Sequence, residues 1–163
     1  LLDLSKTVLP LRDPSAPASE QVEAAAKAVA WADALILASP DYHGSMSGTI
    51  KNFLDHFYKE FAGKLFGYIV ASHEKGLTAM DQMRTAVRQC CGWSMPYGVS
   101  INGEQDFANG QIANAEVSRR LEMMSRDLVV YGRLMRGQFA RDLGSSEPYT
   151  FAAHYRVLLK SAS

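Results

Sequence analysis

The chain has 163 residues, a length that suits one ordinary domain, and 47% of them are hydrophobic, which is enough to bury a core. Its 17 basic residues balance 17 acidic residues, so net charge favours neither nucleic acid nor an anionic membrane surface as a partner. Because no apolar run approaches the roughly 20 residues that span a bilayer, we expect a single cytoplasmic domain over residues 1–163, with no membrane or nucleic-acid partner.

The first part of the chain predicts a loop, a helix and a strand. Residues 9–19 are rich in proline and form the predicted loop. The alanine-rich segment 20–32 has apolar residues at helical spacing, which predicts a helix that covers a sheet. Residues 34–38 (ALILA) are a short continuous apolar run, typical of a strand buried on both faces of a parallel sheet.

Helix and strand then alternate. Residues 47–60 carry one wide apolar stripe and predict a helix whose aromatic face contacts the sheet or another subunit. Residues 65–71 (LFGYIVA) predict a second buried strand. The stripe over residues 77–90 predicts the next helix, which would begin with a capping box of Thr78 and Asp81.

Residues 97–101 predict a third strand, and residues 117–131 belong to a predicted long helix. Repeated strand and helix alternation indicates a parallel sheet with helices on both faces. Ligands of such sheets bind at the carboxyl ends of the strands. The loops after Ala38, Ala71 and Ile101 are therefore the candidate ligand-binding segments.

The loop after the first strand, residues 39–48 (SPDYHGSMSG), has the composition of a ligand-binding turn. Pro40 restricts the backbone, Gly44 permits close backbone approach, and Tyr42 and His43 supply flat rings with polar tips. Such a loop can enclose an aromatic ligand. The alternative is that proline and glycine only turn the chain while Tyr42 packs on its neighbours.

A motif runs through this loop and the helix after it: Pro40-x-Tyr42-His43 followed by Gly48-x-x-Lys51-Asn52-x-x-Asp55. With this motif, the sequence resembles the NADPH-dependent FMN reductase family. The likeness continues through residues 63–72 (GKLFGYIVAS) and 106–112 (DFANGQI). It implies an α/β, flavodoxin-like three-layer sandwich, with a parallel sheet of strand order 2-1-3-4-5 and helices on both faces.

The resemblance also implies which residues bind the cofactor. The first loop would line the isoalloxazine ring of FMN through the residues Pro40, Asp41, Tyr42, His43, Gly44 and Ser45. The second flavin loop of the family corresponds here to Ser72, His73, Glu74 and Gly76. That loop is usually glycine-rich, whereas residues 72–76 (SHEKG) contain one glycine, so a solvated charged turn is an equal alternative for this segment.

The activity that the resemblance implies is that of an NAD(P)H-dependent oxidoreductase. Hydride would pass from NADPH or NADH to bound FMN, and a small acceptor such as a flavin or a quinone would then take the electrons. One alternative is a flavodoxin-like electron-transfer or sensory module that binds FMN without turning over a pyridine nucleotide. Another is a ligand-free interaction domain on the same fold, which the altered second loop favours.

This chemistry requires few catalytic side chains from the protein, because the flavin carries out the reaction. We name no catalytic side chain, and the histidines show no spacing typical of a metal site. Lys51 and Asp55 are interpreted as a structural i, i+4 pair on a helix. Since aromatic residues crowd residues 53–61 and members of the family commonly associate, we expect a homodimer or homotetramer.

The start of the chain, residues 1–13, resembles the end of the family's second strand and the loop after it. A sheet of order 2-1-3-4-5 built from these residues alone would lack its central strand and the loop that binds the FMN phosphate at a helix N-terminus. We therefore expect the domain to be incomplete at the N-terminus, by roughly 30 residues that form one strand, loop and helix.

Overall fold

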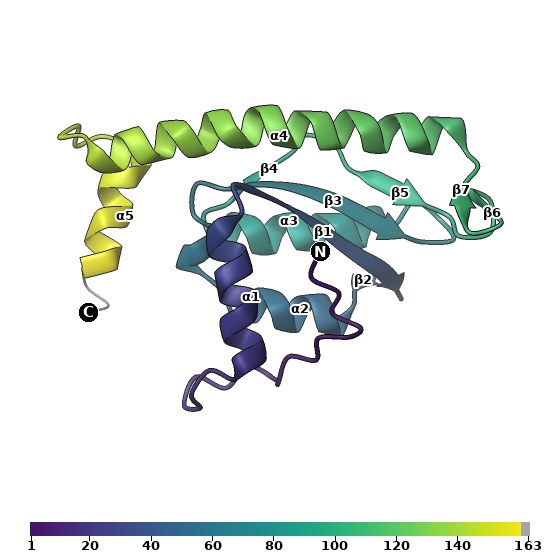
Figure 1. Ribbon diagram of the computed structural model, residues 1–163, viewed down its shortest axis with the longest axis horizontal. Coiled ribbons are helices and arrows are strands. Elements are labelled where there is room, and N and C mark those ends of the chain that lie inside the picture. The colour runs from purple at the N-terminus through teal and green to yellow at the C-terminus, as the bar shows by residue number, and fades with distance from the viewer. Residues whose placement is uncertain (161–163) are drawn as a thin grey trace.

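The structure, a computed structural model, describes residues 1–160 and has the predicted alternation of strands and helices (Figure 1). Its elements in chain order are α1 (Glu20–Trp31), β1 (Ala34–Tyr42), β2 (Ser45–Met46), α2 (Gly48–Asp55), the 3₁₀ turn η1 (Lys59–Phe61), β3 (Leu65–Ala71), α3 (Leu77–Gln89), β4 (Trp93–Ser94), β5 (Val99–Ile101), β6 (Phe107–Ala108), β7 (Gln111–Ile112), α4 (Ala115–Gly144) and α5 (Phe151–Lys160).

A mostly parallel sheet forms the centre of the molecule. β1 and β3 pair in parallel from Ala34 opposite Leu65 to Pro40 opposite Ala71. The other edge of β3 pairs with β4 near its start and with β5 near its end, both in parallel. From β1 through β3 to β4 and β5, the strands therefore lie in chain order. Strands 3, 4 and 5 of the predicted order 2-1-3-4-5 are arranged in the same way. Within residues 1–160, the only strand that pairs with β1 on its remaining side is the short β2.

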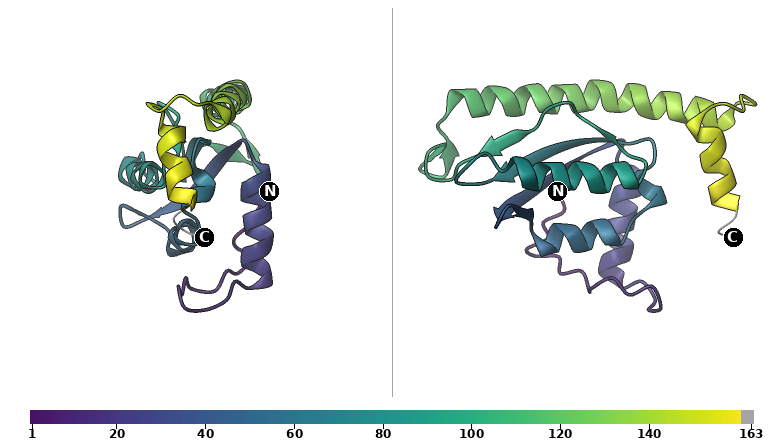
Figure 2. Two further views of the ribbon diagram at one scale, coloured as in Figure 1. Left: turned by 90° about the vertical axis from the view of Figure 1, so that its left-hand side faces the viewer. Right: turned by 180° about the vertical axis from the view of Figure 1, so that it is seen from behind.

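Helices cover both faces of this sheet, as predicted. Alternate residues of a strand point to opposite faces, and Phe66, Tyr68 and Val70 of β3 pack in one core with residues of α1, α2 and α3. Leu65 and Ile69 point the other way, into a second core beneath α4. The result is the expected three-layer arrangement, with α4 along one face and α2 and α3 along the other (Figures 1 and 2).

The three phenylalanines of α2 and of the segment after it are buried within their own domain. Phe53, Phe57 and Phe61 are 5% exposed or less, and their ring centroids lie 5.1 to 6.2 Å apart. The reason given for expecting an oligomer from this segment is therefore wrong, because only Tyr58 remains half exposed. The predicted helix over residues 47–60 ends at Asp55, and Phe57 follows it while Phe61 lies in η1, but all three rings still point into the core.

Two further expectations differ from the structure, one about the start of α3 and one about the first residues of the chain. The predicted capping box at Thr78 and Asp81 does not form, because α3 begins after Gly76, which has a φ of 57° and provides no side-chain cap. Asp81 instead pairs with Arg84 at 2.9 Å. The first thirteen residues contain no strand, and Asn52 of α2 holds them by hydrogen bonds to the Leu9 and Pro10 carbonyls of 3.2 and 3.0 Å.

The helix α4 is longer than expected and extends past the sheet (Figure 1). Its far end packs on α5 through Phe139, whose ring centroid lies 5.5 Å from that of Tyr155. The Tyr155 hydroxyl donates a hydrogen bond of 2.7 Å to the Lys59 carbonyl, which ties α5 to η1. Across the described part of the chain, none of the helices is both long enough and apolar enough to cross a membrane.

Candidate functional site

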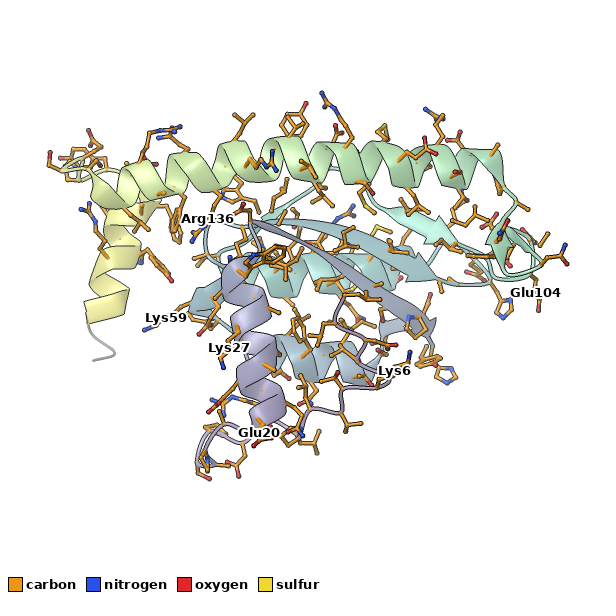
Figure 3. All side chains as sticks on the ribbon, in the orientation of Figure 1. Lys6, Glu20, Lys27, Lys59, Glu104 and Arg136 are labelled. Carbon is orange, nitrogen blue, oxygen red and sulfur yellow. The ribbon has the colours of Figure 1, made fainter. Side chains whose placement is uncertain are left out.

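The carboxyl ends of β1, β3 and β5 meet at the end of the molecule where Glu104 lies (Figure 3). Ser72, directly after β3, connects all three strands. Its backbone N–H donates to the Ile101 carbonyl at 2.9 Å, and its hydroxyl donates to Asp41 Oδ2 at 3.2 Å. Two of the sequence-predicted site residues, Asp41 and Ser72, are thus brought into direct contact although they are far apart in the sequence.

The segment that was expected to be an open loop after β1 is a tight β-hairpin. β1 continues to Tyr42, and Tyr42 pairs with Ser45 in β2. His43 and Gly44, with φ values of 57° and 76°, form the two-residue connection. A turn with two positive φ values matches the right-handed twist of paired strands. The expected loop is wrong in form, but the same residues remain at the end of the strand.

The side chains at the hairpin tip face solvent. Tyr42 is 62% exposed, and His43 is also exposed. Within residues 1–160, neither ring has a hydrogen-bond or aromatic partner. Tyr42 therefore does not pack on its neighbours as the alternative interpretation required, and both rings are free to contact a bound molecule.

A glutamine on α3 fixes the hairpin in place. Gln82 Oε1 accepts hydrogen bonds from the Ser45 hydroxyl at 2.8 Å and from the Met46 N–H at 3.2 Å. Its amide nitrogen donates to the Gly44 carbonyl at 3.4 Å. Sequence reasoning missed this residue, because a polar residue on an amphipathic helix looks the same whether it meets solvent or a loop.

The segment after β3 is held by its backbone and exposes its charged side chains. The His73 carbonyl accepts a hydrogen bond of 3.1 Å from the side chain of Asn102, which follows β5 and was not predicted as a site residue. The Glu74 N–H donates to the Ser72 hydroxyl at 3.2 Å. Gly76 is buried in a left-handed conformation, and a Cβ there would lie 2.4 Å from Val70, so the fold requires glycine at this position.

The hairpin residues fit the ring part of a flavin. Asp41 Oδ1 is buried and has no hydrogen-bond partner among the described residues, and an acceptor in that state costs free energy unless a donor reaches it. A flavin ring offers both an N–H donor and a flat aromatic surface. The surface suits the exposed Tyr42 and His43, and the space around Gly44, where a Cβ would meet nothing within 4 Å, permits close approach of the ligand.

The remaining motif residues have structural roles. Lys51 Nζ and Asp55 Oδ1 lie 2.6 Å apart on the exposed side of α2, as expected of an i, i+4 pair. Asn52 anchors the N-terminal segment, since it also accepts a hydrogen bond of 3.0 Å from the Arg12 N–H. In the part of the chain that the structure describes, no three potential metal ligands come together.

Comparison with known proteins decides the family. The model of the NADPH-dependent FMN reductase family matches residues 1–106. The chain belongs to this family. FMN-dependent NADPH-azoreductases of Staphylococcus aureus, from strains USA300 and NCTC 8325, are 37% identical to it over 84 residues, which are 49% of this chain and 43% of the relative. The chain therefore spans less than half the length of these curated relatives.

Solved structures of this kind have the same fold. FerB, a flavoenzyme NAD(P)H:(acceptor) oxidoreductase of Paracoccus denitrificans, superposes with a TM-score of 0.65 at 20% identity, over 78% of this chain and 77% of its own. An apo NADH:FMN oxidoreductase, EMOB, gives a TM-score of 0.59 at 24% identity, over 91% of this chain and 71% of its own. The predicted flavodoxin-like fold is thereby confirmed.

Proposed function

We propose that the protein is an FMN-dependent NAD(P)H oxidoreductase, which uses NADPH or NADH and passes electrons to a small acceptor such as a flavin or a quinone. The observation that supports this most directly is the hairpin with the family's Pro40-x-Tyr42-His43 motif, at the carboxyl end of a central parallel strand. Membership of the FMN reductase family and the azoreductase relatives support the same activity.

In this proposal, bound FMN supplies the hydride chemistry. The protein residues bind and orient it. Tyr42 and His43 would contact the ring, and the buried, unpartnered Asp41 Oδ1 would accept a hydrogen bond from it. Gln82 and Ser72 hold the hairpin against α3 and β3, so that the ring is bound in one orientation. No protein proton donor is needed, and we assign none.

The remaining proposed cofactor contacts are the backbone of Pro40, Gly44 and Ser45 and the segment of Ser72, His73, Glu74 and Gly76. For the second segment, the hydrogen bond from Asn102 to the His73 carbonyl supports a fixed backbone close to the hairpin. The use of pyridine nucleotides supports a cytoplasmic location.

The test combines a binding and a turnover measurement. The Tyr42→Ala variant should bind FMN more weakly in a fluorescence titration while its thermal unfolding is unchanged, since Tyr42 is exposed. Tyr58→Ala is the matched control, because Tyr58 is also half exposed but lies next to η1. If both variants bind FMN as tightly as the parent protein, the assignment of the hairpin is wrong.

Anaerobic mixing of the FMN-bound protein with NADPH then separates the two flavin functions. An oxidoreductase should bleach the flavin absorbance rapidly. A flavin that stays oxidised would point to the alternative, an electron-transfer module without NAD(P)H turnover.

We further propose that the protein forms a homodimer or homotetramer. The outward face of α4 supports this proposal, because Met123, Val130 and Leu134 are spaced seven and four residues apart and are 36%, 36% and 63% exposed. Such spacing places them on one side of the helix. A stripe of large apolar side chains on an outer surface is typical of an interface.

A further inference from the structure

Two asparagines of the chain, Asn102 and Asn109, are each followed by glycine. An asparagine in this position can modify itself, because the backbone nitrogen of the next residue can attack the side-chain amide. Glycine permits this attack best, since it has no side chain to hinder it and its backbone is the most adaptable. The structure shows that the two sites differ in whether the asparagine side chain is free to react.

Among residues 1–160, the side chain of Asn109 differs from those of the other asparagines in having no hydrogen-bond partner. The side chain of Asn52 is bonded to the N-terminal segment. The side chain of Asn114 caps α4 and donates a hydrogen bond of 2.6 Å to Asp106. Asn109 is also exposed to solvent. Its amide carbon is therefore accessible and can turn toward the backbone.

The side chain of Asn102, by contrast, is held through both of its polar atoms. Its amide nitrogen donates a hydrogen bond of 3.1 Å to the His73 carbonyl. Its Oδ1 accepts hydrogen bonds from the N–H groups of Glu104 at 3.0 Å and of Gln105 at 3.3 Å. These bonds must break before the side chain can turn toward the Gly103 nitrogen, which slows the reaction at Asn102 in the folded protein.

The backbone at Asn109 is also able to move. Asn109 and Gly110 form the tip of the β6–β7 hairpin, close to the start of α4 (Figure 1). The ladder of this hairpin ends at the pair of Ala108 with Gln111, so both tip residues lie outside it. The two strands form a sheet of their own, and an isolated two-stranded hairpin is only marginally stable. Local opening therefore brings the Gly110 nitrogen within reach of the Asn109 side chain.

We propose that Asn109 is a site of spontaneous deamidation in the folded protein and that Asn102 is not. The Gly110 nitrogen forms a bond to Asn109 Cγ and loses its proton, and the side-chain nitrogen leaves as ammonia. Water then opens the resulting succinimide ring at either carbonyl, which gives aspartate or isoaspartate. No atom is oxidised or reduced. The proposal does not depend on the proposed flavin activity.

The two products change the hairpin to different extents. Aspartate leaves the backbone as it is and adds one negative charge to a chain that has no net charge. Isoaspartate also inserts an extra carbon into the backbone, which moves Ala108 and Gln111 out of register. The change stays local, because the Asp106 carbonyl accepts hydrogen bonds from the N–H groups of Ala113 at 2.8 Å and Asn114 at 3.2 Å, behind the hairpin.

Incubation of the purified protein in mildly alkaline buffer tests the proposal. Isoelectric focusing should show a more acidic form that accumulates faster as the pH rises, because the attacking nitrogen must lose its proton. Peptide mapping by mass spectrometry should locate the gain of about 1 Da, from amide to acid, at Asn109. The reaction there should be at least about tenfold faster than at Asn102, where a hydrogen bond has to break first.

Variants and unfolding show whether the fold selects the site. Asn109→Gln should abolish the acidic form, because glutamine would have to close a larger ring. Gly103→Ala is the matched control, since it removes the other asparagine–glycine step at a position where a Cβ would meet nothing within 4 Å. It should leave the rate unchanged. In protein unfolded by urea, Asn102 and Asn109 should react at similar rates, because the hydrogen bonds of Asn102 are lost.

The proposal is overturned if Asn109 stays unmodified during the incubation, or if Asn102 reacts as fast as Asn109 in the folded protein. It is also overturned if Asn109→Gln retains the acidic form. A difference between the two sites that persists in urea would overturn it as well, since the fold would then not select the site.

Discussion

At the scale of single residues, Gln82 contributes most to the shape of the candidate site. Its side chain joins α3 to Gly44, Ser45 and Met46 through three hydrogen bonds. The motif residues Pro40, Tyr42 and His43 could be found from the sequence, because their order is specific. Gln82 could not be found in this way, since its partners are 36 to 38 residues away and only the fold brings them together.

We expect Gln82→Ala to lower the free energy of unfolding by about 1–2 kcal/mol and to weaken FMN binding, because the hairpin loses its attachment to α3. Gln89→Ala on the exposed side of the same helix should change neither quantity. Denaturant unfolding and FMN titration of the two variants measure the effects. Unchanged FMN affinity in Gln82→Ala would show that the hairpin does not need this support.

A buried tyrosine gives a prediction about alkaline pH. Burial raises the pKa of Tyr68 to about 12, although its hydrogen bond with Ser94 and the charge of Arg84 act in the opposite direction. Since the pKa in the unfolded chain is near 10, the folded state favours the protonated form. Its contribution to stability is complete below about pH 10 and is lost as the pH rises toward 12.

Phenylalanine has no hydroxyl to ionise. In Tyr68→Phe, the loss of stability that Tyr68 causes as the pH rises from about 10 toward 12 should therefore be absent. Unfolding midpoints in urea measured between pH 9 and pH 12 check the prediction, and Tyr149→Phe is the control because Tyr149 is 96% exposed. Parallel pH profiles of the parent protein and Tyr68→Phe would contradict it.

At the scale of elements, apolar patterns predicted the strands and helices that pack in the core, because those patterns record burial directly. β3 and α3 lie where they were expected, and β1 begins where it was expected but continues to Tyr42. The wrong predictions concern the start of α3 and the end of α2, where the local sequence pattern differs from what the packed structure contains. The capping box at Thr78 was not used, because the chain reaches α3 through the left-handed Gly76. Helical spacing predicted that Phe53, Phe57 and Phe61 share one face, and their rings do pack together, but it did not reveal that α2 ends at Asp55.

The attachment of the far end of α4 can be tested at Gly63. This residue has a φ of 72°, and a Cβ there would lie 2.4 Å from the Phe139 ring. Gly63→Ala should therefore lower the free energy of unfolding by about 1–3 kcal/mol. Gly137→Ala within α4 should raise it by about 0.5–1 kcal/mol, because a Cβ there would make only an ordinary contact of 3.6 Å with the Arg141 side chain and alanine favours a helix. Thermal unfolding of both variants should show shifts of opposite sign.

At the scale of the whole molecule, the sequence predicted the three layers and the parallel order, but the phenylalanines from which it predicted self-association are buried in the domain. The exposed stripe of Met123, Val130 and Leu134 now supports the proposed oligomer. Leu134→Glu should reduce the molar mass measured by light scattering at micromolar concentration. Val8→Glu, on the N-terminal segment at a site that is 74% exposed, should not change it. A monomeric parent protein would remove the proposal.

The unequal pairing of the two central strands has a consequence for the exchange of backbone protons with solvent. β3 has strand neighbours on both edges, whereas within residues 1–160 most of β1 is paired only with β3. Ile36, in the middle of β1, is 45% exposed. Successive amides of a strand point to alternate edges, so in heavy water every second amide of β1 should exchange quickly while those of β3 remain protected. The protein would thus show two rates of deuterium uptake within one strand, and that alternation would disappear wherever another chain came to lie beside β1.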